Sequence, residues 1–300
     1  MDVQTTGMPA AVSASMQEQL ENLRISRIES AQKPTTGQRF VIPRKDKAGV
    51  NVILHRPAAA EGPLPVIFNL HGGSWIGGDA ILMESFCALL AEKLPALVVN
   101  VNYTKVDVQP YPYAWEELLD AVLYFAAHAE EFGADPARMV VGGHSAGAHI
   151  ALGAAMLLRD VNFPLAGQML VYPPTDMTGR RNGERADFHK LMFREDAERD
   201  AEPMASPLHA PKEALEGLAP VLMIVCGKDS LRPQGLGYAE RLQEADVPVL
   251  VREWPEAMHG FLEVNRPDYP TDPERQTPEQ DAMAREAEEW LIEQLNRLLA

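Results

Sequence analysis

Short apolar runs and amphipathic stretches alternate along most of the chain, and this alternation predicts the fold class. The apolar runs have the length of strands that are covered on both sides, and they occupy residues 96–102, 139–142, 167–172, 219–226 and 247–253. The stretches with helical periodicity occupy residues 80–93, 114–132, 146–159, 233–244 and 279–299. Strands and helices that alternate in this way form a mainly parallel sheet with helices on both faces.

The first third of the chain adds elements to this pattern. The stretches "RFVIP" and "VNVILH" predict two short strands, and "LPVIFNLHGG" predicts a buried third strand that ends in a glycine pair. Nearer the N-terminus, "SMQEQLENLRISRIE" predicts an amphipathic helix whose apolar stripe covers part of the main fold. The apolar positions of that helix have near-helical spacing: Met16, Leu20, Leu23 and Ile28.

One segment interrupts the alternation. Residues 177–213 are mostly polar or charged and separate two strand candidates, which predicts an insertion above the sheet rather than another layer of it. With the N-terminal helix, this insertion would form a lid. A chain of 300 residues with 46% hydrophobic residues can bury one large core, so we expect a single domain over residues 1–300.

Charge and cysteine content narrow the classes of partner and compartment. The formal net charge of −16 repels phosphate backbones and anionic lipids, so we expect neither nucleic acid nor a membrane as partner. Cys87 and Cys226 are isolated in apolar segments and form no disulfide framework, which fits a reducing compartment. No run shows the features of a signal peptide or of a membrane span. We therefore expect a cytoplasmic protein, and the sequence leaves its oligomeric state open, a homodimer included.

The segment "MVVGGHSAGAHIALGAAM" carries the first candidate for catalysis. Residues 143–147 match G-x-S-x-G, and the motif lies between a predicted strand and a predicted helix. This setting predicts a sharp turn that lifts the Ser145 hydroxyl above the sheet as a nucleophile, with the N–H of Ala146 facing the same space. Bulk at Gly143 or Gly147 would collide with the strand or the helix. A glycine-rich turn with an incidental serine is the alternative.

The segment "HGGSW", residues 71–75, follows the third strand. Its small residues predict main-chain donors for the oxyanion of a tetrahedral intermediate, and we assign this role to Gly73, Ser74 and Ala146. Ser74 stands where glycine would have most freedom, so we expect a negative φ there unless its hydroxyl adds a donor. A phosphate-binding loop is less well supported, because no G-x-G-x-x-G or Lys-Ser/Thr pair is present. Among the flanking residues we expect Gly72, Trp75 and His144 to contact the substrate.

Asp229 and His259 complete the candidate set. Asp229 follows the apolar run in "VLMIVCGKDS", and His259 follows a later strand candidate in "VLVREWPEAMHGF". The chain order Ser, Asp, His is the one found where a strand-to-helix turn carries the serine. A serine hydroxyl needs a base to take its proton, and the base needs an acid to fix its tautomer. Each residue alone also fits an ordinary turn or surface position.

Metal and cofactor chemistry lack support in the sequence. His144 and His149 are five residues apart, about 140° around a helix, so they cannot share an ion as an i, i+4 pair does. We therefore expect no metal and no cofactor. The acidic residues of the last predicted helix fit a solvated face: Glu286, Glu288 and Glu289.

These motifs together resemble the hormone-sensitive-lipase-like esterases of the α/β-hydrolase superfamily. The resemblance runs from Val66 to Phe261 and includes "HGGSW", "YPYAWEELLDAV", "DPARMVVGGHSAG", "YPPTD", "SPLHAP", "DSLRPQG" and "MHGF". It implies an α/β-hydrolase fold with a helical cap, made by about residues 1–35 and 177–213. It also implies that Ser145, Asp229 and His259 form a catalytic triad that hydrolyses small carboxylic esters.

Three departures from the family pattern leave the substrate open. Ser74 replaces the third glycine of the oxyanion loop, His144 replaces the usual acid before the nucleophile, and Pro233 replaces the usual acid after "LR". The chain also resembles arylformamidase, which cleaves N-formylkynurenine on the same fold. A non-catalytic ligand-binding member of the fold is a further alternative, although such a protein would be expected to lack a triad residue. The apolar residues of the insertion suffice to roof a small pocket, which favours short acyl chains: Phe188, Leu191, Met192, Phe193 and Met204.

Overall fold

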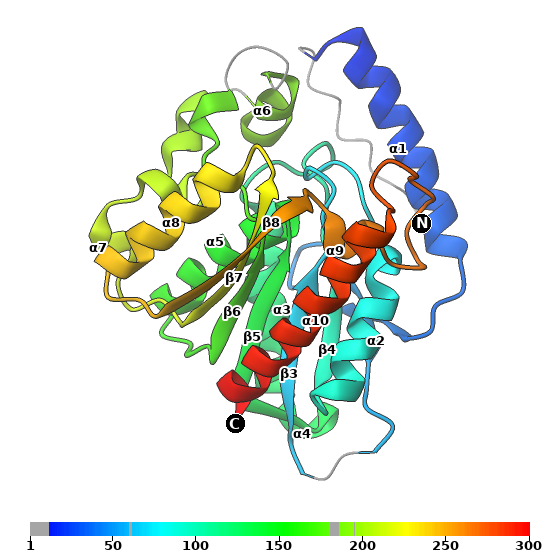
Figure 1. Ribbon diagram of the computed structural model, residues 1–300, viewed down its shortest axis with the longest axis vertical. Coiled ribbons are helices and arrows are strands. Elements are labelled where there is room, and N and C mark those ends of the chain that lie inside the picture. Colours follow the sequence, from blue (N-terminus) through cyan, green and yellow to red (C-terminus); the bar gives the residue numbers. More distant parts are fainter. Residues whose placement is uncertain (1–11, 60–61, 181–185, 195) are drawn as a thin grey trace.

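An eight-stranded sheet runs through the centre of the molecule (Figure 1). The computed structural model describes residues 12–59, 62–180, 186–194 and 196–300. The strands of this part are β1 (Gln38–Ile42), β2 (Val50–His55), β3 (Leu64–Leu70), β4 (Leu97–Asn102), β5 (Ala134–His144), β6 (Gly167–Val171), β7 (Val221–Lys228) and β8 (Val249–Met258). Their order across the sheet is β1-β2-β4-β3-β5-β6-β7-β8. The β1/β2 and β2/β4 pairs are antiparallel, and the pairs from β4/β3 to β7/β8 are parallel.

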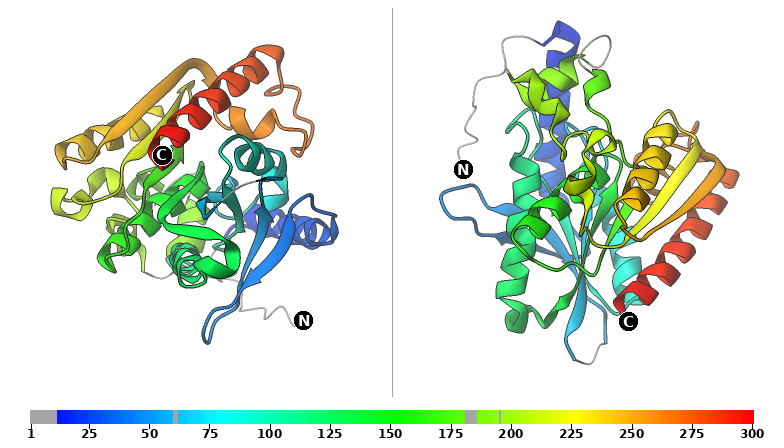
Figure 2. Two further views of the ribbon diagram at one scale, coloured as in Figure 1. Left: turned by 90° about the horizontal axis from the view of Figure 1, so that it is seen from below. Right: turned by 90° about the vertical axis from the view of Figure 1, so that its left-hand side faces the viewer.

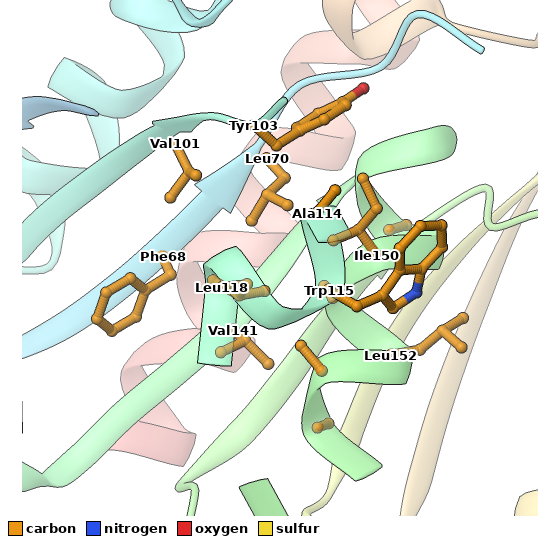
Figure 3. Close-up of a cluster of buried hydrophobic side chains, with 14 of the residues drawn as sticks. Phe68, Leu70, Val101, Tyr103, Ala114, Trp115, Leu118, Val141, Ile150 and Leu152 are labelled. Atoms are coloured by element: carbon orange, nitrogen blue, oxygen red, sulfur yellow. The ribbon is translucent and has the colours of Figure 1, made fainter. Parts of the chain in front are cut away.

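Helices cover both faces of this sheet (Figure 2). Side chains alternate along each strand, so β3 directs Phe68 and Leu70 to one face and Ile67 to the other. Figure 3 shows the first face, where Phe68 and Leu70 belong to the same buried cluster as Trp115 of α3 and Ile150 of α5. α8 also packs on this face, whereas α2 and α10 pack on the other. The expected mainly parallel sheet with two helical layers is confirmed.

The helices of the described residues include all those predicted, together with three short ones that the sequence analysis did not predict. They are α1 (Ala14–Gln32), α2 (Glu84–Lys93), α3 (Tyr113–Ala127), α4 (Ala129–Phe132), α5 (Ala146–Asp160), α6 (Ala186–Phe193), α7 (Lys212–Leu215), α8 (Arg232–Glu244), α9 (Phe261–Val264) and α10 (Pro278–Leu299), with short 3-10 turns between them. The predicted helix 114–132 is divided in two, because His128 leaves the helical conformation with φ −112° and ψ 27°.

The apolar stripe predicted for the N-terminal helix is wrong at one position. Met16 and Leu20 of α1 are buried, but Ile28 is 60% exposed. Seven residues after Leu20, almost two full turns, Arg27 takes the inward position and forms an ion pair with the buried carboxylate of Asp107. This side of α1 is therefore apolar in its first half and charged in its second.

α6 and the start of α1 lie beyond the end of the sheet toward which the parallel strands point (Figure 1). The N–H of Ser13, just before α1, donates to a carboxylate oxygen of Asp187 in α6 at 3.2 Å. The predicted lid segments therefore meet above this edge. Residues 1–11, 181–185 and 195 of the predicted cap lie outside the described residues. Among the described helices, none is long and apolar enough to cross a membrane.

Glu288 of α10 departs from the expected solvated face. Its side chain is buried and pairs with the buried guanidinium of Arg266. Arg285, one turn earlier on the helix, also pairs with it at 2.6 Å. These ion pairs compensate the cost of burying the Glu288 charge. The buried partner, Arg266, comes from the loop before α10, whereas Arg285 belongs to the helix itself.

Candidate active site

The turn that carries Ser145 is as tight as its glycines predict. β5 ends at His144 and α5 begins at Ala146, which leaves Ser145 with φ 50° and ψ −116°. A Cβ atom at position 143 would lie 2.6 Å from the carbonyl oxygen of Leu70, and one at position 147 would lie 2.3 Å from it. The expected collision with neighbouring backbone is therefore confirmed. This close approach places Ser145 between β3 and β6, where its N–H donates to Val171 O at 2.9 Å.

Three residues from separate strand ends form a continuous hydrogen-bonded chain. The Nε2 atom of His259 lies 2.9 Å from the Ser145 hydroxyl, and its Nδ1 atom lies 2.6 Å from Oδ2 of Asp229. Asp229 directly follows β7 and is buried, whereas His259 follows β8 and its side chain is 36% exposed. With a proton on Nδ1 donated to the carboxylate, Nε2 is free to accept the hydroxyl proton. The structure thus brings these three sequence-predicted residues together.

The loop after β3 faces the same hydroxyl. Gly73 has φ 128°, and Ser74 and Trp75 have φ values of 53° and 63°, so the expected negative φ at Ser74 is wrong. The reason is a closed turn in which Gly77 N–H donates to Gly73 O at 2.7 Å. Within the described part of the chain, no acceptor takes the N–H of Gly73 or Ser74. The N–H of Ala146, the first residue of α5, lies in the first helical turn, where donors lack an intrahelical partner.

A pocket of about 280 Å³ opens above the serine. Phe188 reaches it from α6, so the insertion contributes one wall. Trp75 lines another wall. The residues around the pocket are Ser74, Trp75, Ser145, Pro174, Phe188, Asp229, Ser230, Leu231 and His259.

Gly72 and His144, also expected to contact substrate, are not among the residues that line this pocket. The N–H of Gly72 donates to Oε1 of Glu263 at 2.8 Å. His144 is fully buried, with its ring against Phe86 and its Nδ1 3.4 Å from the hydroxyl of Tyr172. Burial lowers the pKa of His144 to about 3, so its ring is neutral at physiological pH. The sequence analysis missed Glu263 and Tyr172. Both lie in or next to motifs named above, "MHGF" and "YPPTD", but nothing in the sequence indicates that their side chains contact each other.

A buried lysine, Lys105, contacts His71 at the start of the loop after β3. The sequence analysis missed this residue too. Lys105 Nζ contacts Nε2 of His71 at 3.0 Å, Asn102 Oδ1 at 3.1 Å and Tyr103 O at 2.7 Å. His71 then carries its proton on Nδ1 and donates it to Gly72 O at 2.5 Å. Burial lowers the pKa of Lys105 to about 7. Lys105 thus links His71, at the start of this loop, to the end of β4.

Comparison with known proteins places this geometry in context. A family model described as the alpha/beta hydrolase fold matches residues 67–263. The carboxylic ester hydrolase LipN of Mycobacterium tuberculosis is 35% identical over 227 residues, which span 69% of this chain and 60% of LipN. The esterase LipI of the same organism is 35% identical over 219 residues, which span 69% of this chain and 68% of LipI.

Solved structures agree with these sequence relatives. A bacterial heroin esterase has a TM-score of 0.75 at 26% identity, over 94% of this chain and 93% of its own. A thermostable esterase from Pseudomonas putida has the same TM-score and identity, over 98% of this chain and 99% of its own. The likeness to both structures therefore covers the sheet and the segments above it.

Proposed function

The chain belongs to the α/β-hydrolase family, and from this premise we propose that it is a serine carboxylesterase that hydrolyses small, short-acyl carboxylic esters. The observation that carries the proposal is the hydrogen-bonded chain from Asp229 through His259 to Ser145 at the floor of an open pocket. Relatives named as esterases and a carboxylic ester hydrolase support the reaction class.

Ser145 is the nucleophile of the proposed reaction. Its oxygen attacks the ester carbonyl while His259 Nε2 takes the hydroxyl proton, and Asp229 stabilises the resulting imidazolium. The negative oxygen of the tetrahedral intermediate faces the N–H groups of Gly73, Ser74 and Ala146.

Collapse of this intermediate expels the alcohol, which takes the proton from His259, and leaves the acyl group on the serine. A water molecule, activated by the same histidine, then releases the carboxylic acid and restores the free hydroxyl.

The pocket supports the short-acyl part of the proposal. Its volume of about 280 Å³ is at the lower end of ligand sites, and Phe188 and Trp75 narrow it. Residues 12–35 and the described part of 177–213 would act as the cap that sets this size. Each methylene that does not fit costs about 1–3 kcal/mol, so rates should fall steeply once the pocket is full.

The test is a substrate series with the purified protein. We expect kcat/KM for p-nitrophenyl esters to be highest for acetate or butyrate and to fall for octanoate and palmitate. Ser145→Ala should lower kcat by roughly 10⁴-fold or more, and an organophosphate should label Ser145. A maximum at palmitate, or a rise in rate at an emulsion interface, would indicate a lipase. Fast cleavage of N-formylkynurenine without ester hydrolysis would indicate an arylformamidase, and binding without turnover would indicate a ligand-binding protein.

A further inference from the structure

Glu263 is a buried carboxylate that the proposed reaction does not use. It lies in α9, four residues after His259, and only 7% of its surface is exposed. Its Oε1 accepts from Gly72 N–H at 2.8 Å, and its Oε2 accepts from the Tyr172 hydroxyl at 3.2 Å. Both partners donate, which is the arrangement that an ionised carboxylate requires.

The contact with Gly72 is close. A Cβ atom at position 72 would lie 2.5 Å from Oε1 of Glu263, so a larger residue there would displace the carboxylate. The glycine allows the carboxylate to approach the backbone. Glu263 therefore rests directly on the backbone that leads into Gly73 and Ser74, the proposed oxyanion donors.

Tyr172 connects the same carboxylate to the other two catalytic segments. It follows β6 with φ 41°, an uncommon conformation for a tyrosine, and its N–H donates to Ile224 O at 2.8 Å. Its ring centroid lies 4.9 Å from that of His259, and its hydroxyl lies 3.4 Å from Nδ1 of His144, the residue before the nucleophile. The oxyanion loop, the nucleophile turn and the histidine loop thus converge on one tyrosine and one glutamate.

The charges around Glu263 fit an anion that acts on His259. Burial raises the pKa of Glu263, while the Gly72 N–H, His259, the Tyr172 hydroxyl and Arg275 each lower it. The other titratable groups that sense its charge have raised pKa values and are neutral at physiological pH: Tyr103, Tyr172, Cys226 and Tyr269. The carboxylate of Glu263 and the ring of His259 therefore interact electrostatically.

We propose that Glu263 is a positioning residue that ties the oxyanion loop to the histidine loop through Gly72 and adds negative charge beside His259. This inference rests on the proposed esterase function. Glu263 has two effects on the reaction. The contact with Gly72 keeps the Gly73 and Ser74 donors at a fixed distance from Ser145, and the charge stabilises the imidazolium that forms during attack.

Two substitutions separate these effects. Glu263→Gln keeps an acceptor for Gly72 N–H but removes the charge, whereas Glu263→Asp keeps the charge but shortens the reach to Gly72. The matched control is Glu84→Gln, because Glu84 is a buried carboxylate that accepts the N–H groups of Thr36 and Gly37, both at 3.0 Å, away from the pocket. Each variant is measured for kcat, KM and the pH dependence of kcat/KM, and its melting temperature verifies that it is folded.

We expect Glu263→Gln to lower kcat about tenfold with KM within about twofold of wild type. The acid limb of its kcat/KM profile should move to lower pH, because the substitution removes the negative charge that interacts with His259. Glu263→Asp should lower kcat without moving the acid limb, and Glu84→Gln should match wild type in both. If Glu263→Gln does not fold, Tyr172→Phe, which removes one oxygen, should still lower kcat at least about threefold.

The proposal is overturned if Glu263→Gln, or Tyr172→Phe where the first variant is unfolded, matches Glu84→Gln in kcat and in the position of the acid limb. Ser145→Ala distinguishes this outcome from failure of the esterase function. Loss of activity in Ser145→Ala with normal Glu263 variants refutes only the positioning role. Full activity in Ser145→Ala refutes the proposed function itself.

Discussion

Lys105, which contacts His71 at the start of the loop after β3, allows a direct test of how a buried titratable group affects the free energy of unfolding. The residue is only 4% exposed. Its ammonium group has three hydrogen-bond acceptors, on His71, Asn102 and Tyr103. Desolvation nevertheless lowers its pKa from 10.5 to about 7, although the nearby carboxylates of Asp79, Glu117 and Asp107 oppose the shift. The perturbation is Lys105→Met, which keeps an unbranched side chain and removes the titration.

The sign of the effect follows from proton binding in the two states. Between pH 7 and 10.5 the unfolded chain keeps the Lys105 proton while the folded chain has lost most of it, so the free energy of unfolding rises with pH. The full slope for one proton is about 1.4 kcal/mol per pH unit. Because the folded lysine is half protonated near pH 7, the gain from pH 7 to pH 9 is about 2 kcal/mol. The neutral amine has only two N–H groups for its three acceptors, and the loss of one hydrogen bond opposes deprotonation in the folded state. The gain of about 2 kcal/mol is therefore an upper bound.

The assay is urea unfolding of wild type and Lys105→Met at pH 7 and pH 9. The variant removes the donor that Lys105 offers to three acceptors, which costs up to about 1–3 kcal/mol for each at both pH values. Only the change with pH is therefore interpreted, and titrating groups that do not interact with Lys105 cancel in the difference. We expect wild type to gain up to about 2 kcal/mol relative to the variant. Parallel pH dependence, or a relative loss by wild type, would refute the reasoning.

Three further predictions test the site and the fold. Asp229→Asn should lower kcat by roughly 10³- to 10⁴-fold with little change in KM, because an amide does not hold the productive tautomer of the catalytic histidine; unchanged steady-state kinetics would contradict this. Gly147→Ala places a Cβ atom 2.3 Å from Leu70 O, so we expect a lower melting temperature and at least about a tenfold loss of kcat, and retention of both would show that the turn can relax. Leu20→Ala should cost about 2–5 kcal/mol in urea unfolding because Leu20 is fully buried, whereas the exposed Ile28→Ala should stay within about 0.5 kcal/mol of wild type; equal costs would argue against the packing of α1.

The sequence by itself determined the layers of the fold and the residues of the nucleophile turn. Apolar runs such as 167–172 indicated β6, because a strand covered on both faces needs apolar residues on both sides. The glycines around Ser145 indicated a sharp turn, because the sterics of a strand-to-helix turn depend on adjacent residues. Asp229 and His259 were found from their positions after two strands, and parallel strands end at the same edge of the sheet.

Only the tertiary structure decided how these residues are supported. Glu263 and Gly72 are 191 positions apart, and they meet because the loop after β3 and the helix after β8 fold over the same edge. Lys105 reaches His71, 34 positions away, only after β4 pairs with β3, and Glu288 is buried because Arg266 comes back against α10. The local pattern of polar and apolar residues predicts whether a position faces solvent or the hydrophobic core. Whether a buried charge finds a partner depends on segments that only the folded sheet brings together.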